Sequence, residues 1–137
     1  MCSSDLPQSP YSASKISADA LGESYYRSFN TPITIVRPFN TYGPRQSPRA
    51  LIPTIILQAL TSKRIHIGSL DPQRDFTFVK DTAKGFVAVA ETDNLKGEHV
   101  NLGVGKTISV KDILDNIIEL TDFKGKVVLD KIGRAHV

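Results

Sequence analysis

A helix pattern followed directly by a strand pattern restricts the first third of this chain to an α/β arrangement. Ser9 is a favourable N-cap and Pro10 suits the first helical position, so we expect a helix from there to about Phe29. Segment 30–32, Asn-Thr-Pro, ends that helix. Segment 33–36 (ITIV) is a β-branched run typical of a buried parallel strand. A helix and a strand joined by a short loop predict an α/β sheet.

The rest of the chain continues this alternation. Residues 37–50 contain three prolines and a glycine and predict an ordered loop. The loop follows the carboxyl end of strand 33–36, where open α/β sheets bind their ligands. Further helices are expected at 51–60 and 81–92 and from Ser109 onward, where Ser109 and Asp112 form a capping-box pattern. Short strands are expected at 64–67, 75–79, 99–102 and 126–129.

Composition argues against several classes of function. The 137 residues are 40% hydrophobic and 23% charged, which is typical of a globular protein. No apolar run reaches the ~18 residues of a membrane span, and scattered basic residues with a net charge of +3 do not favour nucleic acid. Cys2 is the only cysteine, so we expect a reducing, cytoplasmic compartment. His66 and His99 have no partner at metal-ligand spacing, so we expect no metal site.

Both ends of the chain resemble translated sequencing-adapter DNA. MCSSDL at the start and IGRAHV at the end match approximately complementary adapter strands. We therefore expect segments 1–6 and 132–137 to be non-native tails. The natural part, about 7–131, is then expected to be a fragment of a longer protein.

Two residues of the first predicted helix indicate proton-transfer chemistry. Tyr11 and Lys15 are four residues apart, which places a phenol and an ammonium on one helix face. A phenol ordinarily ionises near pH ~10, and a nearby cation favours its ionised form, so such a tyrosine can act as a general base. The alternative is a half-buried aromatic residue beside a solvated lysine.

An ordered set of motifs resembles the extended short-chain dehydrogenase/reductase family. After Tyr11 and Lys15 come RPFNTYGP at 37–44, Arg74-Asp75-Phe76 with Asp81, and Asn101-Leu102-Gly103. The resemblance covers nearly all of 7–131 and is nearest to NAD-dependent nucleotide-sugar 4,6-dehydratases of bacterial amino-sugar and legionaminic-acid-type pathways. It implies an α/β fold, namely the C-terminal half of a Rossmann-like fold with a small mixed α/β substrate-binding domain.

The resemblance also implies how the chain is divided. Residues 7–39 would be the last part of the NAD-binding Rossmann domain. Residues 40–131 would be mainly the substrate-binding region, with helix 81–92 packing back on the Rossmann part. The family's Gly-rich phosphate loop, its catalytic Ser/Thr and the acidic pair of dehydratases would lie upstream of Pro7. We therefore expect the chain alone to be inactive and not to bind NAD tightly.

For the reaction, the resemblance implies the following roles. Tyr11 would take the proton of the sugar 4-hydroxyl while hydride leaves C4 for NAD. Lys15 would hold the nicotinamide ribose, and Pro38 would line the nicotinamide side of the cleft. Water would then be eliminated across C5 and C6, and hydride would return to C6.

The resemblance assigns five residues to the nucleotide-sugar substrate. Asn40 would hydrogen-bond the substrate near its diphosphate, and Leu51 and Ile52 would offer backbone N–H groups at a helix start. Arg74 would bind a phosphate through two hydrogen bonds of its guanidinium group. Asn101 would contact the nucleotide end. The alternatives are turn residues for the two asparagines and a surface salt bridge to a neighbouring aspartate for Arg74.

Two other functions stay open at this point. A 4-epimerase of the same family shares the Tyr11/Lys15 chemistry but returns hydride to C4. A non-catalytic module could use the same fold to hold a nucleotide sugar. The family often dimerises through the helix at 11–29, so we expect the intact enzyme to be a homodimer. The nucleotide and the sugar stay undetermined.

Overall fold

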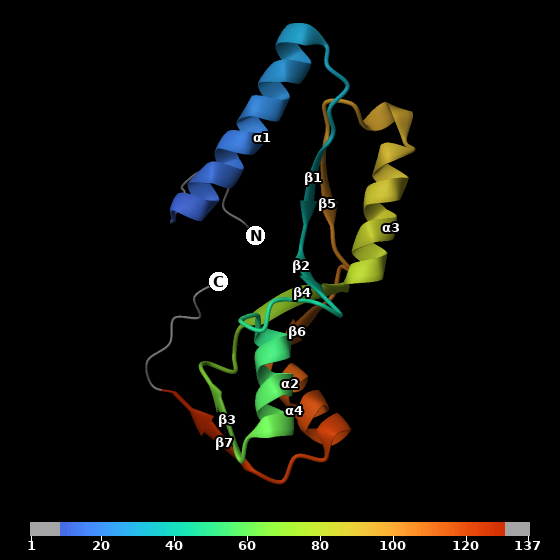
Figure 1. The fold of residues 1–137 in the computed structure, drawn as a ribbon. Coiled ribbons are helices and arrows are strands. Elements are labelled where there is room, and N and C mark those ends of the chain that lie inside the picture. Colours follow the sequence, from blue (N-terminus) through green and yellow to red (C-terminus); the bar gives the residue numbers. More distant parts are fainter. Residues whose placement is uncertain (1–8, 131–137) are drawn as a thin grey trace. The chain divides into compact units, whose positions relative to one another are not determined.

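The structure is a computed structural model that describes residues 9–130 (Figure 1). The expected non-native tails, 1–6 and 132–137, lie outside the described residues. In chain order the elements are α1 (Pro10–Phe29), β1 (Ile35–Pro38), β2 (Asn40–Tyr42), α2 (Leu51–Thr61), β3 (Arg64–Ile67), β4 (Gln73–Phe78), α3 (Val79–Ala90), the 3-10 helix η1 (Asp93–Leu95), β5 (His99–Leu102), β6 (Thr107–Ser109), α4 (Val110–Thr121) and β7 (Lys126–Leu129).

The strand pairings confirm the predicted α/β class with parallel strands. The pairs β1–β5, β2–β4 and β3–β7 are parallel, and β4–β6 is antiparallel. No helix within residues 9–130 is long and apolar enough to cross a bilayer.

Helix α1 begins and ends where its local sequence predicts. The Ser12 backbone N–H donates to the Ser9 hydroxyl at 3.1 Å, and the Ser9 N–H donates to the Ser12 hydroxyl at 3.0 Å. This reciprocal capping box satisfies two donors that the first turn would otherwise leave unpaired. Asn30 ends the helix at a left-handed φ of 53°, a conformation that asparagine tolerates better than most residues.

The chain divides into two compact units. Within the described residues, unit 1 comprises 9–38 and 82–102, and unit 2 comprises 39–81 and 103–130. The division falls inside α3, whose first three residues, 79–81, belong to unit 2.

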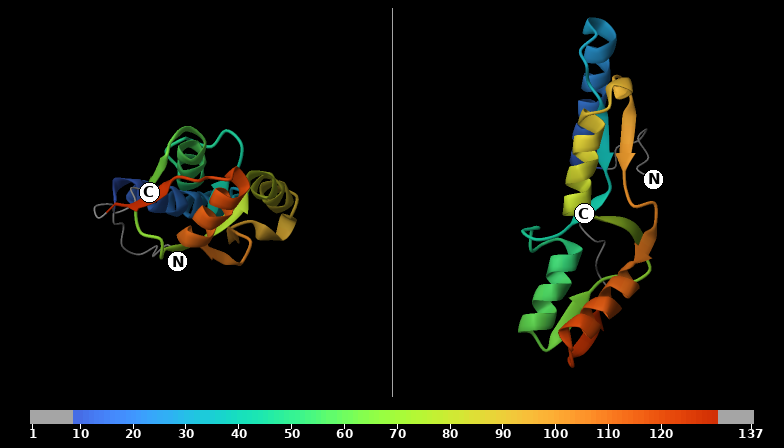
Figure 2. Two further views of the ribbon diagram at one scale, coloured as in Figure 1. Left: turned by 90° about the horizontal axis from the view of Figure 1, so that it is seen from below. Right: turned by 90° about the vertical axis from the view of Figure 1, so that its right-hand side faces the viewer.

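In unit 1, two helices accompany a two-stranded parallel sheet. Strands β1 and β5 run side by side in both figures, with Pro38 opposite Leu102 at their carboxyl ends (Figures 1 and 2). Helix α1 approaches β1 at Gly22, where an added Cβ would lie 3.6 Å from the Ile35 side chain. Helix α3 approaches β5 more closely, because a Cβ on Gly85 would lie 3.0 Å from Leu102.

Unit 2 contains the hydrophobic core. Helices α2 and α4 pack beside the β3–β7 pair, and the three-stranded sheet has the order β2–β4–β6. Every buried apolar side chain of the described residues belongs to this unit: Ile55, Ile65, Ile67, Val110, Ile113, Leu114 and Ile117. An isoleucine-to-alanine change at a site as buried as Ile55 or Ile65 costs about 2–5 kcal/mol. The stability of unit 2 therefore depends on aliphatic packing.

Some predicted boundaries are wrong. Strands β2 and β6 lie in segments for which we expected no strand. Strand β1 covers Ile35–Pro38 rather than 33–36. Helix α3 begins at Val79, so Asp81 lies in its first turn instead of marking its start.

Candidate active site

The predicted proton-transfer pair occupies the first turns of α1. The Lys15 Nζ lies 5.5 Å from the centre of the Tyr11 ring, which is within cation–π range. The two side chains therefore share one helix face, as their spacing predicts. Tyr11 is 70% exposed, so its side chain is open to a ligand. The catalytic roles of both residues stay predictions.

An ion pair ties this face of α1 to the carboxyl end of β1. Asp19 stands one helical turn beyond Lys15. Its Oδ2 accepts a hydrogen bond from Arg37 Nε at 2.8 Å and lies 2.7 Å from Arg37 Nη2 in an ion pair. Arg37 directly precedes Pro38, and Asn101 of β5 lies opposite Arg37. Unit 1 thus links the helix of the predicted proton-transfer pair to the strand ends that carry Pro38 and Asn101.

In unit 2, the predicted substrate residues Asn40 and Arg74 adjoin a buried carboxylate. Asn40 Nδ2 donates to the Asp75 carbonyl at 3.4 Å, and Arg74 is the residue before Asp75. Asp75 is 9% exposed, and its two carboxylate oxygens accept the backbone N–H groups of Val104 at 3.1 Å and Gly105 at 2.8 Å. Asp75 therefore holds the turn before β6 and, through its main chain, the Asn40 amide.

A glycine makes room for that carboxylate. A Cβ on Gly103 would lie 2.8 Å from Asp75 Oδ2 and 2.4 Å from the Phe39 ring, so any larger residue would displace one of them. We did not predict a site role for Asp75 from the sequence. The available signal was the alternation of β4, which places Asp75 on the same inward face as Thr77. A carboxylate on a buried face requires hydrogen-bond donors.

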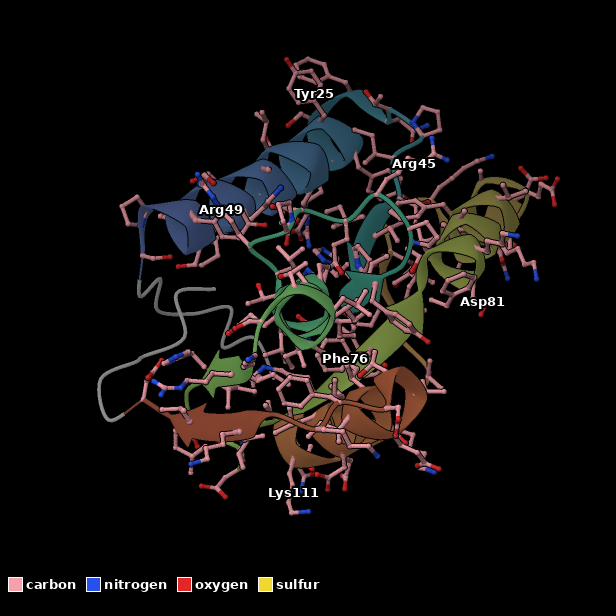
Figure 3. All side chains as sticks on the ribbon, turned by 60° about the horizontal axis from the view of Figure 1, so that its bottom comes forward. Tyr25, Arg45, Arg49, Phe76, Asp81 and Lys111 are labelled. Carbon is pink, nitrogen blue, oxygen red and sulfur yellow. The ribbon has the colours of Figure 1, made fainter. Side chains whose placement is uncertain are left out.

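Arg74 presents an exposed guanidinium group. Its Nη1 donates to the Gln73 carbonyl at 2.9 Å. Among the contacts of residues 9–130, Arg74 forms no ion pair with Asp71 or Asp75, so the salt-bridge alternative does not apply to this structure. Arg45 and Arg49, also in unit 2, belong to the loop before α2 and are exposed as well (Figure 3).

The start of α2 can offer a ligand its backbone N–H groups rather than its side chains. Leu51 and Ile52 pack against the unit 2 core. Ala50 is the N-cap and makes no side-chain cap hydrogen bond, and the first turn contains no acidic residue. A helix start of this kind has free N–H groups and a positive dipole end, which favour an anionic ligand.

A pocket in unit 1 is lined by other residues. It has a volume of about 470 Å³ between β1 and α3, and its lining includes Thr34, Val36, Phe86, Val89 and Lys96. None of the predicted site residues lines it. No group of three or more side chains that could hold a metal ion occurs in the described part of the chain. The candidate site is therefore described by its side chains and their contacts within each unit.

The sequence profile of the NAD dependent epimerase/dehydratase family matches residues 2–103. The uncharacterized UDP-glucose epimerase YtcB of Bacillus subtilis is 38% identical over 129 residues, which are 93% of this chain and 41% of that protein. The dTDP-glucose 4,6-dehydratase 1 of Escherichia coli is 36% identical over 119 residues, which are 82% of this chain and 33% of that protein. The chain thus spans well under half the length of either relative.

A solved structure with the same fold contains both a cofactor and a substrate. UDP-glucuronic acid 4-epimerase from Bacillus cereus, in complex with UDP-glucuronic acid and NAD, superimposes with a TM-score of 0.84 at 35% identity. The match covers 90% of this chain and 40% of that one. Proteins similar to this chain therefore include both dehydratases and epimerases.

Proposed function

The chain belongs to the NAD dependent epimerase/dehydratase family, and we propose that it is part of an NAD-dependent nucleotide-sugar 4,6-dehydratase. The observation that carries this proposal is the contact between the Lys15 ammonium and the Tyr11 ring on one face of α1. In this proposal unit 1 is the last part of the NAD-binding domain, and unit 2 is the main part of the substrate-binding region.

The residues of unit 1 fit a nicotinamide nucleotide. Tyr11 and Lys15 are exposed on α1, and Pro38 is exposed at the carboxyl end of β1. The Lys15 ammonium has three donors that can bind ribose hydroxyls, and the Pro38 ring offers an apolar side to the nicotinamide. When bound, NAD supplies the acceptance and return of a hydride.

Tyr11 is proposed to be the base that removes the proton of the sugar 4-hydroxyl. The Lys15 cation stabilises the phenolate that this requires. A ketone at C4 makes the C5–H acidic, so water can be eliminated across C5 and C6. We assign no residue of this chain to the groups that assist this elimination.

The substrate diphosphate is proposed to bind unit 2. Arg74 provides a planar, exposed donor group, and Asn40 provides an amide held in place by the Asp75 carbonyl. The N–H groups of Leu51 and Ile52 add the helix start of α2. Asn101, on β5 of unit 1, is proposed to contact the nucleotide end.

A 4-epimerase is the second candidate, because the relatives named above include two epimerases. It would use Tyr11 and Lys15 in the same way but would not eliminate water. A non-catalytic binding module is less well supported, since the chain contains both residues of the proton-transfer pair. We further propose that the intact enzyme is a cytoplasmic homodimer and that the 137-residue chain alone has no turnover.

The test uses the longest natural reading frame that contains residues 7–131, with NAD and a panel of UDP-, GDP- and dTDP-hexoses. We expect a 4-keto-6-deoxy product, and we expect Tyr11→Phe to lower kcat by about 10²–10⁴ because the general base is lost. Tyr25→Phe, on the same helix, is the matched control and should keep full activity. Unchanged turnover of Tyr11→Phe would contradict the proposal.

The same assay in D₂O separates the two reactions. Elimination removes the C5 hydrogen and later replaces it from solvent, so a dehydratase product carries deuterium at C5. A C4-epimerised product without deuterium would instead identify the epimerase.

A further inference from the structure

Lys15 stands between two groups that could each bind its ammonium. Tyr11 lies one turn before it on α1 and Asp19 lies one turn after it, so both are neighbours on the helix surface. The structure places Lys15 Nζ over the Tyr11 ring. The Asp19 carboxylate instead binds Arg37 of β1 through an ion pair that includes the Nε hydrogen bond.

We infer that Arg37 is a positioning residue that keeps Lys15 available to Tyr11 by occupying the Asp19 carboxylate. The Asp19 side chain is only 28% exposed, so it is costly to leave without a cation. Helix α1 contains two cations, and Arg27 already pairs with Glu23. Without Arg37, Lys15 is the cation of α1 that lies one turn from Asp19.

The inference gives the Asp19–Arg37 pair a role beyond joining α1 to β1. If the pair only joined α1 to β1, removing Arg37 and removing both partners would weaken the Lys15–Tyr11 contact equally. If Arg37 prevents Lys15 from binding Asp19, removing both partners restores the Lys15–Tyr11 contact, because no competing carboxylate is left. The catalytic meaning of this role rests on the proposed function, but the contact itself can be measured without turnover.

The experiment measures the NMR shift of the Lys15 ε-methylene protons in the 137-residue chain. The Tyr11 ring moves these protons upfield when the ammonium lies over it, and Tyr11→Leu gives the value without the ring. We expect Arg37→Gln to lose about a quarter to a half of the upfield shift, because a helical ion pair of ordinary strength changes the ratio of two side-chain states by about 1.4- to 2.3-fold. Asp19→Asn combined with Arg37→Gln should restore it.

Two further variants sharpen the test. Arg27→Gln removes the Glu23 ion pair of the same helix and should leave the Lys15 shift unchanged. Arg37→Lys serves if Arg37→Gln lowers the folded fraction. Lysine keeps the charge but cannot reproduce the contact of two guanidinium nitrogens with Asp19, so the Lys15 shift should fall partway and recover when Asp19→Asn is added.

Folding of each variant is followed by circular dichroism. A folded Arg37→Gln chain with the wild-type Lys15 shift would overturn the inference. The inference would also be overturned if the Lys15 upfield shift of the Asp19→Asn and Arg37→Gln double variant stays as small as that of Arg37→Gln alone. If these shifts behave as expected but Tyr11→Phe keeps full turnover, the proposed function fails and the positioning role of Arg37 stands.

Discussion

Arg74 and Asp75 are neighbours on β4 with opposite environments. Arg74 is exposed and binds only the carbonyl of Gln73 among the described residues, whereas Asp75 is buried and accepts two backbone N–H groups. Alternation along the strand produces this difference, because successive side chains point to opposite faces. One residue is therefore available to a ligand, and the other supports the turn that follows β5.

The first prediction concerns Arg74. We expect Arg74→Lys to weaken binding of UDP or dTDP by about tenfold, because an ammonium cannot make the two parallel hydrogen bonds of a guanidinium group with a phosphate. Arg64→Lys is the control, since Arg64 is also exposed on a strand of unit 2. Isothermal titration calorimetry gives both affinities. Both substitutions keep the positive charge, so a general charge effect predicts no loss in either variant. Equal affinities of the two variants would contradict a specific phosphate contact of Arg74.

Candidate site residues can be named from the sequence, but most contacts between residues cannot. Tyr11 and Lys15 could be paired from helical spacing alone, because both lie within one turn. Asp75 could not be connected to Val104 in this way, since their hydrogen bond joins residues 29 positions apart. The Arg37–Asp19 pair, 18 positions apart, likewise depends on how α1 packs beside β1.

At the scale of elements, local signals decide which boundaries can be predicted. Helices α1 and α4 both start at a serine with a capping box, and both starts were predicted. Strand β1 is displaced from 33–36 because its extent is set by pairing with β5, where Ile35 lies opposite His99. Strands β2 and β6 are three residues long and exist through pairing with β4, which no local pattern reveals.

The capping box of α4 leads to a pH prediction. The Ser109 hydroxyl and backbone N–H donate to Asp112 and hold the pKa of its carboxyl below the ordinary value near 3.8. A pKa that is lower in the folded state means that the stabilisation is present above the ordinary value and lost as pH falls through the lowered one. We therefore expect stability to fall below about pH 4.

Urea unfolding at neutral pH and near pH ~3 measures this contribution. Asp112→Asn should reduce the difference in unfolding free energy between the two conditions. Ser109→Ala should do the same, because the serine is the largest cause of the lowered pKa. If both variants show the same difference in unfolding free energy between the two pH values as the wild type, the prediction is contradicted.

At the scale of the whole molecule, unit 1 contrasts with unit 2 in having no buried apolar side chain among the described residues. Its helix α1 exposes Leu21, Tyr25 and Phe29, which follow one another at intervals of four and share a face. The Tyr25 and Phe29 rings are 5.5 Å apart. This apolar face is where we propose that two copies of the intact enzyme meet.

A charge on this face should therefore separate the copies. We expect Leu21→Glu to convert a dimer into a monomer, because two carboxylates would be brought into an apolar contact. Ala20→Glu places the same charge on an exposed position of α1 away from that face and should leave the dimer intact. Light scattering after size-exclusion chromatography gives the mass of each variant of the intact enzyme. A dimeric Leu21→Glu variant would rule out this face.

The chain passes between its two units three times, after Pro38, after Asp81 and after Leu102. Neither unit can therefore be excised as one continuous stretch, and no single protease cut can separate the two units from each other. Exchanging unit 2 for that of a relative would therefore require replacing two separate segments, 39–81 and from 103 onward, in register with the segments of unit 1.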